Sequence, residues 1–90
     1  MSADEHQKTI EQCIAELDMI GNDTSVSRNI RRSVAEIIAT LKDEDQELFL
    51  RAASALKTLS EVSYDQNLPM HTGTYVWGIL SKLETIPPEA

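Results

Sequence analysis

Few side chains in this sequence are suited to catalysis. Apart from carboxylates, the usual catalytic bases and metal ligands are limited to His6, Cys13 and His71. The histidines do not have a metal-binding spacing, and the chain has no cysteine pair and no glycine-rich phosphate loop. Acid pairs such as Asp43 and Glu47 fit an ordinary acidic helix start. We therefore expect no catalytic residue, no metal site and no cofactor, and we expect that the protein is not an enzyme.

Two of those three side chains have simple structural interpretations. Cys13 falls on the apolar face of the first amphipathic segment, so we expect it to be a small buried hydrophobic residue. His6 lies in a terminal turn, where we expect it to be solvated. A single cysteine cannot form an internal disulfide, and the N-terminus has no basic segment followed by an apolar run. We therefore expect a cytoplasmic protein without a signal peptide.

Three arginines in the first turns of a predicted helix are the first candidate contact site. Arg28, Arg31 and Arg32 lie within about one turn, so at least two of them can converge on one anion. With Ser25, Ser27, Asn29 and the free backbone N–H groups of a helix start, they would suit a phosphate or a carboxylate. In the alternative interpretation they pair with nearby acids and have no binding role. The acids concerned are Asp23, Glu36 and the run at residues 43–47.

The second candidate contact site lies in the last amphipathic segment. Its residues are Met70, His71, Thr72 and Tyr75, together with Trp77. Trp77 falls beside the main apolar stripe, and Gly73 and Gly78 flank it. Each glycine inside a helix costs about 1 kcal/mol relative to alanine, which a close helix contact, a docked partner or a frayed turn would explain. Trp77 either fills the edge of the core or, if Tyr75 and Met70 are exposed with it, belongs to an interaction hot spot.

Helices must position these residues, because apolar side chains recur at helical spacing and sustained strand alternation is absent. The predicted helices span about residues 2–20, 26–41, 43–62 and 68–84. Ser2 and Glu5 suggest a capping box at the first start, and Gly21 suits its end. Ser25 or Ser27 is the expected N-cap of the second helix. The third is expected to begin in the acidic run 43–47, and the fourth has Pro69 near its first turn.

A shift of 42 residues superimposes the two halves of the sequence. The register crosses the loop without interruption, which predicts duplication of a helical hairpin. The matched pairs include Leu17 with Leu59, Asp23 with Asp65, Ser25 with Asn67, and Val34 with Val76. A period of this length lies in the range of HEAT and armadillo repeats. Two hairpins would close on each other, with the turns at residues 21–23 and 64–66 at the same end.

The expected fold is therefore all-α, a compact antiparallel four-helix unit made of two related, HEAT-like hairpins. Residues 1–86 form the single domain and residues 87–90 a C-terminal tail. Hydrophobic residues make up 41% of the 90 residues, but only four are aromatic, which favours an aliphatic core. The net charge of −7 disfavours broad contact with nucleic acid or anionic membrane. No apolar run approaches the ~20 residues that span a bilayer.

The leading functional hypothesis is a small interaction module that presents the arginines, His71 and Trp77 to an unidentified protein partner. A homodimer is a further hypothesis, because a small core leaves apolar residues unburied. The alternative, from another functional class, is an RNA- or ribosome-associated factor that binds phosphates through Arg28, Arg31 and Arg32. A third hypothesis is a protein that binds a small anion through the same arginines.

The sequence also resembles a known family. The resemblance rests on Asn-Asp-Thr-Ser-Val-Ser-Arg-Asn-Ile-Arg-Arg at residues 22–32, Leu-Pro-Met-His-Thr at 68–72, Trp77, and Ser-Lys-Leu-Glu-Thr-Ile at 81–86. These segments are similar to those of the archaeal uncharacterised protein family 0147, over nearly the whole chain. The resemblance implies a compact four-helix fold and an archaeal cytoplasm, and it implies no activity. The family usually has proline where Ser27 stands and arginine where Gly73 stands, so the resemblance implies no functional role for either position.

Overall fold

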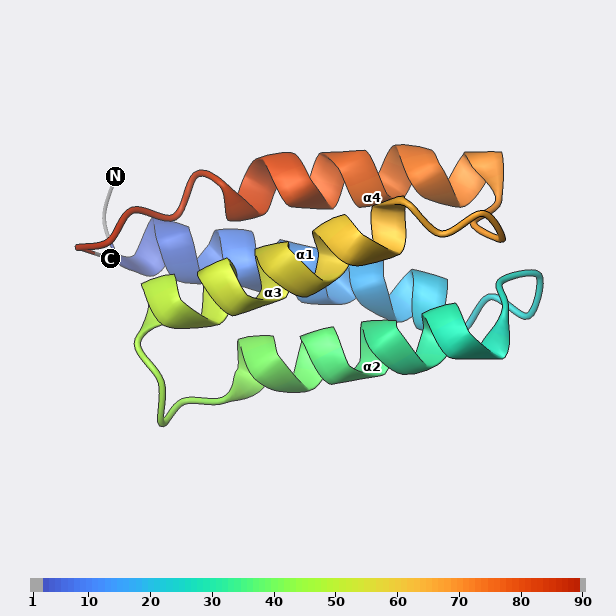
Figure 1. Cartoon of the computed structure of the whole chain (residues 1–90). Helices are drawn as coiled ribbons and strands as arrows, with labels where there is room; N and C mark the ends of the chain where they lie inside the picture. Colours follow the sequence, from blue (N-terminus) through green and yellow to red (C-terminus); the bar gives the residue numbers. More distant parts are fainter. Residues whose placement is uncertain (1–2, 90) are drawn as a thin grey trace.

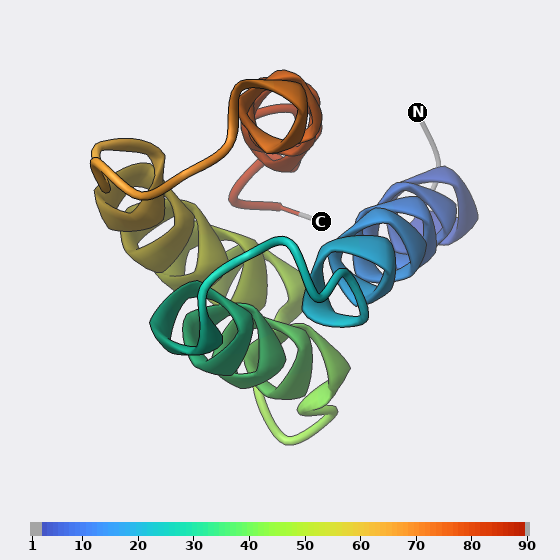
Figure 2. The same cartoon turned by 90° about the vertical axis from the view of Figure 1, so that its right-hand side faces the viewer.

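The computed structural model describes residues 3–89, which form four α-helices joined by short loops (Figure 1). The helices are α1 (Ala3–Gly21), α2 (Arg28–Lys42), α3 (Leu48–Ser63) and α4 (Met70–Leu83). Successive helices run in opposite directions, and the described residues contain no strand. Viewed along the bundle, α1 packs against α2 and α4, and α3 packs against the same two helices (Figure 2). The predicted all-α antiparallel four-helix unit is confirmed.

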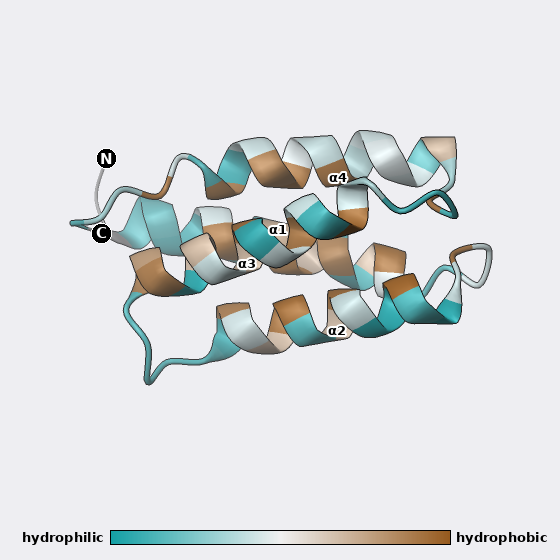
Figure 3. Cartoon of the chain, in the orientation of Figure 1, coloured by the Kyte–Doolittle hydropathy of each residue, from teal (hydrophilic) through white to brown (hydrophobic). Residues whose placement is uncertain are grey.

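Each helix turns one apolar stripe towards a common core (Figure 3). The stripes consist of residues three and four positions apart, which share one face of a helix. Leu17, Ile37, Leu59 and Ile79 represent the four helices and are fully buried. Burial of an aliphatic side chain of this size stabilises the fold by about 1.5–3 kcal/mol. None of the described helices is long and apolar enough to cross a membrane.

The 42-residue register matches the burial pattern of the structure. Leu17 and Leu59 are equally buried, and so are Val34 and Val76. The α1–α2 and α3–α4 loops lie at the same end of the bundle, as the repeat predicts (Figure 1). The two hairpins therefore bury equivalent residues at these positions, whereas Val26 is buried and its counterpart Leu68 only partly so. Their origin by duplication, and the likeness to HEAT repeats, stay predictions.

One turn type connects every pair of successive helices. In each loop an aspartate side chain accepts the N–H of the second following residue, at 2.9 Å for Asp23, 3.1 Å for Asp43 and 2.8 Å for Asp65. The carbonyl of the same aspartate accepts the N–H of the third following residue. Each next helix begins at the fifth residue after the aspartate. The α2–α3 loop joins the two hairpins and has no counterpart in the 42-residue repeat, yet it contains the same aspartate turn. A shared aspartate alone is therefore no proof of duplication.

This turn corrects the predicted start of the third helix. The prediction placed the acidic run 43–47 in its first turn, but α3 begins at Leu48. The Asp43 side chain bonds the backbone of its own loop, and this competes with helix formation. The starts of α2 and α4 agree better with the sequence predictions. Ser27 is the N-cap of α2, and its side chain accepts the N–H of Ile30 at 3.4 Å. Pro69 is the N-cap of α4, one position before its first turn.

The predictions for the two ends of α1, for Cys13 and for His6 have mixed outcomes. Helix α1 ends at Gly21 as predicted, whereas the proposed capping box lies outside the described residues because it needs Ser2. Cys13 is fully buried as predicted, and desolvation raises the pKa of its thiol to about 11. The prediction for His6 was wrong: only 6% of it is exposed, and its Nδ1 is buried without a hydrogen-bond partner.

The core assignment can be tested at Leu59. We expect Leu59→Ala to lower the free energy of unfolding by about 2–5 kcal/mol, because it removes buried surface and leaves a cavity. Urea unfolding followed by circular dichroism measures the change. Leu50→Ala is the matched control on the exposed side of α3, and its effect should stay within about 0.5 kcal/mol. Equal effects of the two substitutions would contradict the assigned core face.

Candidate functional site

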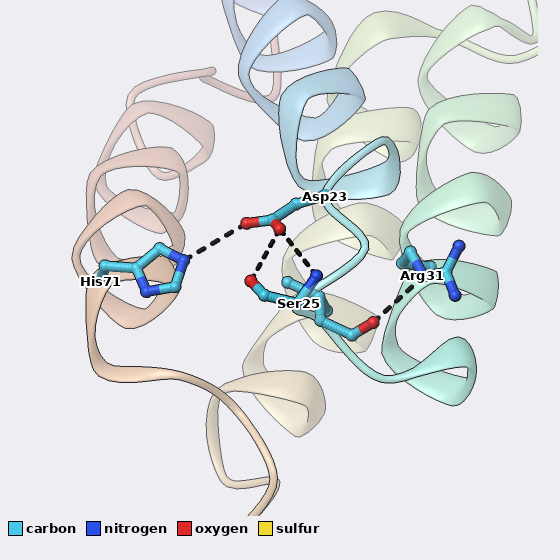
Figure 4. Close-up of polar contacts among 5 residues, drawn as sticks. Asp23, Ser25, Arg31 and His71 are labelled. Carbon is cyan, nitrogen blue, oxygen red and sulfur yellow. Dashed lines mark hydrogen bonds and ion pairs between the residues drawn. The ribbon is translucent and has the colours of Figure 1, made fainter.

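The end of the bundle that carries the α1–α2 and α3–α4 loops brings together residues from both halves of the chain. Asp23 in the first loop lies beside His71 in the first turn of α4, 48 positions later (Figure 4). The Asp23 Oδ2 atom is 3.2 Å from the His71 Nε2 atom. Its Oδ1 atom accepts hydrogen bonds from the Ser25 backbone N–H at 2.9 Å and from the Ser25 hydroxyl at 2.7 Å. The loop is thereby tied to α4.

These contacts lower the pKa of Asp23. The Ser25 hydroxyl bond lowers the pKa of the carboxyl most, followed by the Ser25 N–H bond and then by the bond to His71. Together they lower the pKa from an ordinary 3.8 to about 2, so the carboxylate keeps its charge to a more acidic pH than a free aspartate does. Lys82 of α4 forms a second ion pair, with Glu16 of α1. Both ion pairs found among the described residues therefore join the α1 side of the bundle to α4.

The arginines of α2 do not form the acid pairs considered above. The Arg31 Nε atom donates to the Val26 carbonyl at 3.1 Å, and Arg28 and Arg32 are exposed, as is the neighbouring Asn29. Within residues 3–89, no ion pair joins these arginines to Asp23, Glu36 or the run 43–47. Asp23 pairs with His71 instead.

The structure separates the candidate contact residues into two surfaces. Arg31 and His71 lie on opposite sides of the α1–α2 loop (Figure 4). Helices α2 and α4 stand diagonally across the bundle, so the arginines and Trp77 do not form one patch (Figure 2). A partner that touches both surfaces would have to wrap around the molecule.

Trp77 does not fill the edge of the core, because 67% of it is exposed. Met70, seven residues earlier on the same helix face, is 91% exposed. Tyr64, the C-cap residue of α3, is 85% exposed and lines the same hollow as Trp77. We call Tyr64, Met70 and Trp77 the α4 surface. Tyr75 is also exposed, but it lies on the flank of α4 that faces α1. The placement of Thr72 on this surface was wrong, because only 2% of Thr72 is exposed.

Two shallow hollows border the outer side of α4. The hollow between α3 and α4 holds about 180 Å³. It is lined by Ser60, Ser63, Tyr64, Trp77, Leu80, Ser81 and Glu84. The hollow between α1 and α4 holds about 230 Å³ and contains Met19, Asp23, His71 and Tyr75 among its lining residues. Sequence analysis missed Tyr64 of α3 and Met19 of α1 as surface neighbours of α4, and it missed Glu84, the C-cap residue of α4, as a lining residue. Only the packing of the helices brings these side chains to the hollows, since helical periodicity gives no such signal.

Larger hollows at the opposite end hold about 480 and 440 Å³, and Arg51 lines both of them. The Arg51 Nη1 atom donates to the Leu41 carbonyl at 3.1 Å, so this guanidinium bonds the last turn of α2 and ties it to α3. Arg51 thereby provides a hydrogen-bond donor for a backbone carbonyl at the C-terminal end of α2.

Among the described residues, no group of three or more His, Cys, Asp or Glu side chains is placed to hold a metal ion.

The glycines of α4 are not required by close contacts within the chain. A Cβ atom at Gly78 would meet nothing within 4 Å, and one at Gly73 would meet Leu68 Cδ2 at 3.9 Å, an ordinary contact. Neither glycine has a positive φ angle. A close contact with another helix of the bundle therefore does not explain them. Gly78 leaves open space one residue away from the exposed Trp77.

The fold and its surfaces define a class of protein: a small, acidic, antiparallel four-helix unit with exposed aromatic side chains along its last helix. The chain belongs to the uncharacterised protein family UPF0147, whose model matches residues 1–86. This confirms the resemblance found in the sequence. The description of this family names no activity.

Relatives in archaea and one solved structure agree with this assignment. A UPF0147 protein of Methanosarcina acetivorans is 52% identical over 87 residues, which cover 97% of this chain and 90% of the relative. A UPF0147 protein of Sulfurisphaera tokodaii is 43% identical over 91% of this chain and 92% of its own. The crystal structure of MMP1188, a protein of unknown function, superimposes with a TM-score of 0.84 at 42% identity, over 88% of this chain and 90% of that one.

The hydrogen bonds of Asp23 give a testable pH dependence. Because its folded pKa is lowered to about 2, the stabilisation from Asp23 is fully present above its ordinary value of 3.8 and is lost as the pH falls through about 2. We expect NMR titration of the side-chain carboxyl to give that low pKa. Ser25→Ala should raise the pKa towards 3.8, and more than His71→Ala does. A carboxyl that titrates near 3.8 in the unaltered protein would contradict the described geometry.

The open space at Gly78 gives a second prediction. We expect Gly78→Ala to raise the free energy of unfolding by about 0.5–1 kcal/mol, because alanine is the better helix former and its Cβ meets no atom. Urea unfolding measures the change. Destabilisation would show that α4 packs more closely at this position than described.

Proposed function

We propose that this protein is a small, non-enzymatic cytoplasmic module that binds a partner protein through the α4 surface. The observation that carries the proposal is the exposure of Trp77, the one tryptophan of a chain with only four aromatic residues. Tryptophan and tyrosine dominate the binding energy of protein interfaces when they are covered. Covering a tryptophan removes about 150–250 Å² from water, a large contribution for one side chain.

The neighbours of Trp77 support the same function. Met70 extends the apolar face by two helical turns towards the start of α4, and Tyr64 borders it from α3. The glycine at position 78 lets a partner's backbone approach the helix closely, since no atom of this chain occupies the space. A second copy of the chain is the other candidate occupant, and a net charge of −7 on each copy opposes that association at low ionic strength.

A second candidate function rests on the α2 arginines, because Arg28 and Arg32 are exposed and have no carboxylate partner among residues 3–89. Side chains of this kind suit phosphates, either in RNA or the ribosome or in a small anion. Salt dependence separates this function from the first. Binding through phosphates weakens steeply as the salt concentration rises, whereas binding centred on Trp77 changes little.

Recovery of bound material from an archaeal lysate tests the proposal with two variants on different surfaces. We expect Trp77→Ala to lose a protein partner that survives nuclease treatment, and Leu50→Ala, an equally apolar exposed control, to retain it. Circular dichroism of each variant confirms that folding is unchanged. We expect the double substitution Arg31→Glu and Arg32→Glu to leave this protein partner bound.

Two results would contradict the proposal. Retention of the partner by Trp77→Ala would show that the α4 surface is not the docking site. Nuclease-sensitive material that is lost only with the arginine variant would instead establish the RNA-linked function. Sedimentation of the isolated protein at several concentrations tests the homodimer separately.

A further inference from the structure

The hollow between α3 and α4 is lined by groups that accept hydrogen bonds. The Ser63 hydroxyl donates its proton to the Ser60 carbonyl, and the Ser81 hydroxyl donates to the Trp77 carbonyl at 3.1 Å. Because a hydroxyl has a single proton, both of these oxygens face an incoming ligand with lone pairs alone. The Glu84 carboxylate lines the same hollow and also only accepts.

The electrostatic character of this hollow is negative. No lysine, arginine or histidine is among its lining residues. Lys82, which is near in sequence, pairs instead with Glu16 on the α1 side of α4. The last turn of α3 has no basic residue to offset the negative end of the helix dipole, and this turn contributes Ser60 and Ser63 to the hollow. Glu84 is in no ion pair found among residues 3–89.

Two aromatic rings complete the hollow. Tyr64 and Trp77 both line it and are both largely exposed. The faces of aromatic rings attract cations, and tryptophan does so most strongly. Aromatic rings beside a carboxylate and unoccupied lone pairs match a guanidinium, which is planar, stacks on rings and donates five hydrogen bonds. An ammonium group lacks both the plane and the stacking.

From this combination we infer that the hollow between α3 and α4 binds an arginine side chain of the partner protein. The inference rests on the proposed function and specifies the partner's chemistry at the α4 surface. Charge complementarity supports it, because a chain of net charge −7 attracts a basic segment and repels an acidic one. A phosphate group would face Glu84 and the α3 dipole without a cation to neutralise it.

The probe for this inference is a short peptide, acetyl-Gly-Gly-Arg-Gly-Gly-amide, titrated into the isotope-labelled protein and followed by NMR. The control peptide carries citrulline, which has nearly the shape of arginine but no charge. We expect saturable shifts at Ser60, Ser63, Trp77 and Ser81 with the arginine peptide and much weaker ones with citrulline. Equal shifts with both peptides, or shifts spread over all the exposed acids, would overturn the inference.

Variants identify the groups that hold the arginine. We expect Glu84→Gln and Trp77→Leu each to weaken binding of the arginine peptide about twofold to fivefold, the range of an exposed charge or ring contact. Glu36→Gln on α2 is the matched control, an exposed acid away from the hollow, and should leave binding unchanged. Stronger binding of an octameric oligouridylate than of the arginine peptide at Trp77 would assign the surface to nucleic acid instead.

Partner recovery distinguishes this inference from the proposed function. If Trp77→Ala loses the lysate partner but the protein does not prefer the arginine peptide to the citrulline peptide, the docking surface stands and the arginine inference fails. If Trp77→Ala keeps the partner, both proposals fail. Loss of the partner with Trp77→Ala, together with selectivity for the arginine peptide over citrulline, supports both.

Discussion

Burial of one apolar stripe from each helix in a common core is the interaction on which this structure depends. Helices of 14–19 residues are marginal alone in water, so α1 to α4 are stable only because they pack together. With no disulfide available and few aromatic residues, aliphatic side chains such as Leu17 and Leu59 supply this packing. The core in turn decides which side chains remain outside. Trp77 is exposed because the inward face of α4 is already occupied by Val76, Ile79 and Leu83.

The loops determine which residues of the packed helices lie together on the surface. Each loop is closed by an aspartate, which fixes where the next helix begins, and the α1–α2 and α3–α4 loops meet at one end. The ring of helices closes where α1 meets α4, the first and last helices of the chain. Asp23 with His71 and Glu16 with Lys82 both lie along this seam. With its α1 side held by these pairs, α4 presents Met70 and Trp77 outward, with Tyr64 of α3 beside them.

Much of the fold could be predicted from the sequence, because helical periodicity reports directly on burial. The stripes, the antiparallel order, the Ser27 cap and the buried Cys13 follow from local rules. The start of α3 could not, since acids suit both a helix start and an aspartate-closed turn, and Asp43 adopts the turn. His6 was misjudged because its position near a terminus does not reveal that it packs against the bundle. Of the candidate site, Trp77 and Met70 could be found from their spacing, whereas Tyr64 and Glu84 depend on how α3 and α4 lie together.

The central claim is that the α4 surface, and no other face, meets a partner protein. A photo-reactive amino acid at exposed position 74 lies between Met70 and Trp77 on α4 and leaves both side chains in place. Together with separate variants at exposed positions 50 and 32, it tests the claim in living archaeal cells. The claim predicts one defined protein adduct from position 74, absent from position 50 and insensitive to nuclease. Adducts that form equally from positions 74 and 50, or an RNA adduct from position 32 alone, would contradict it.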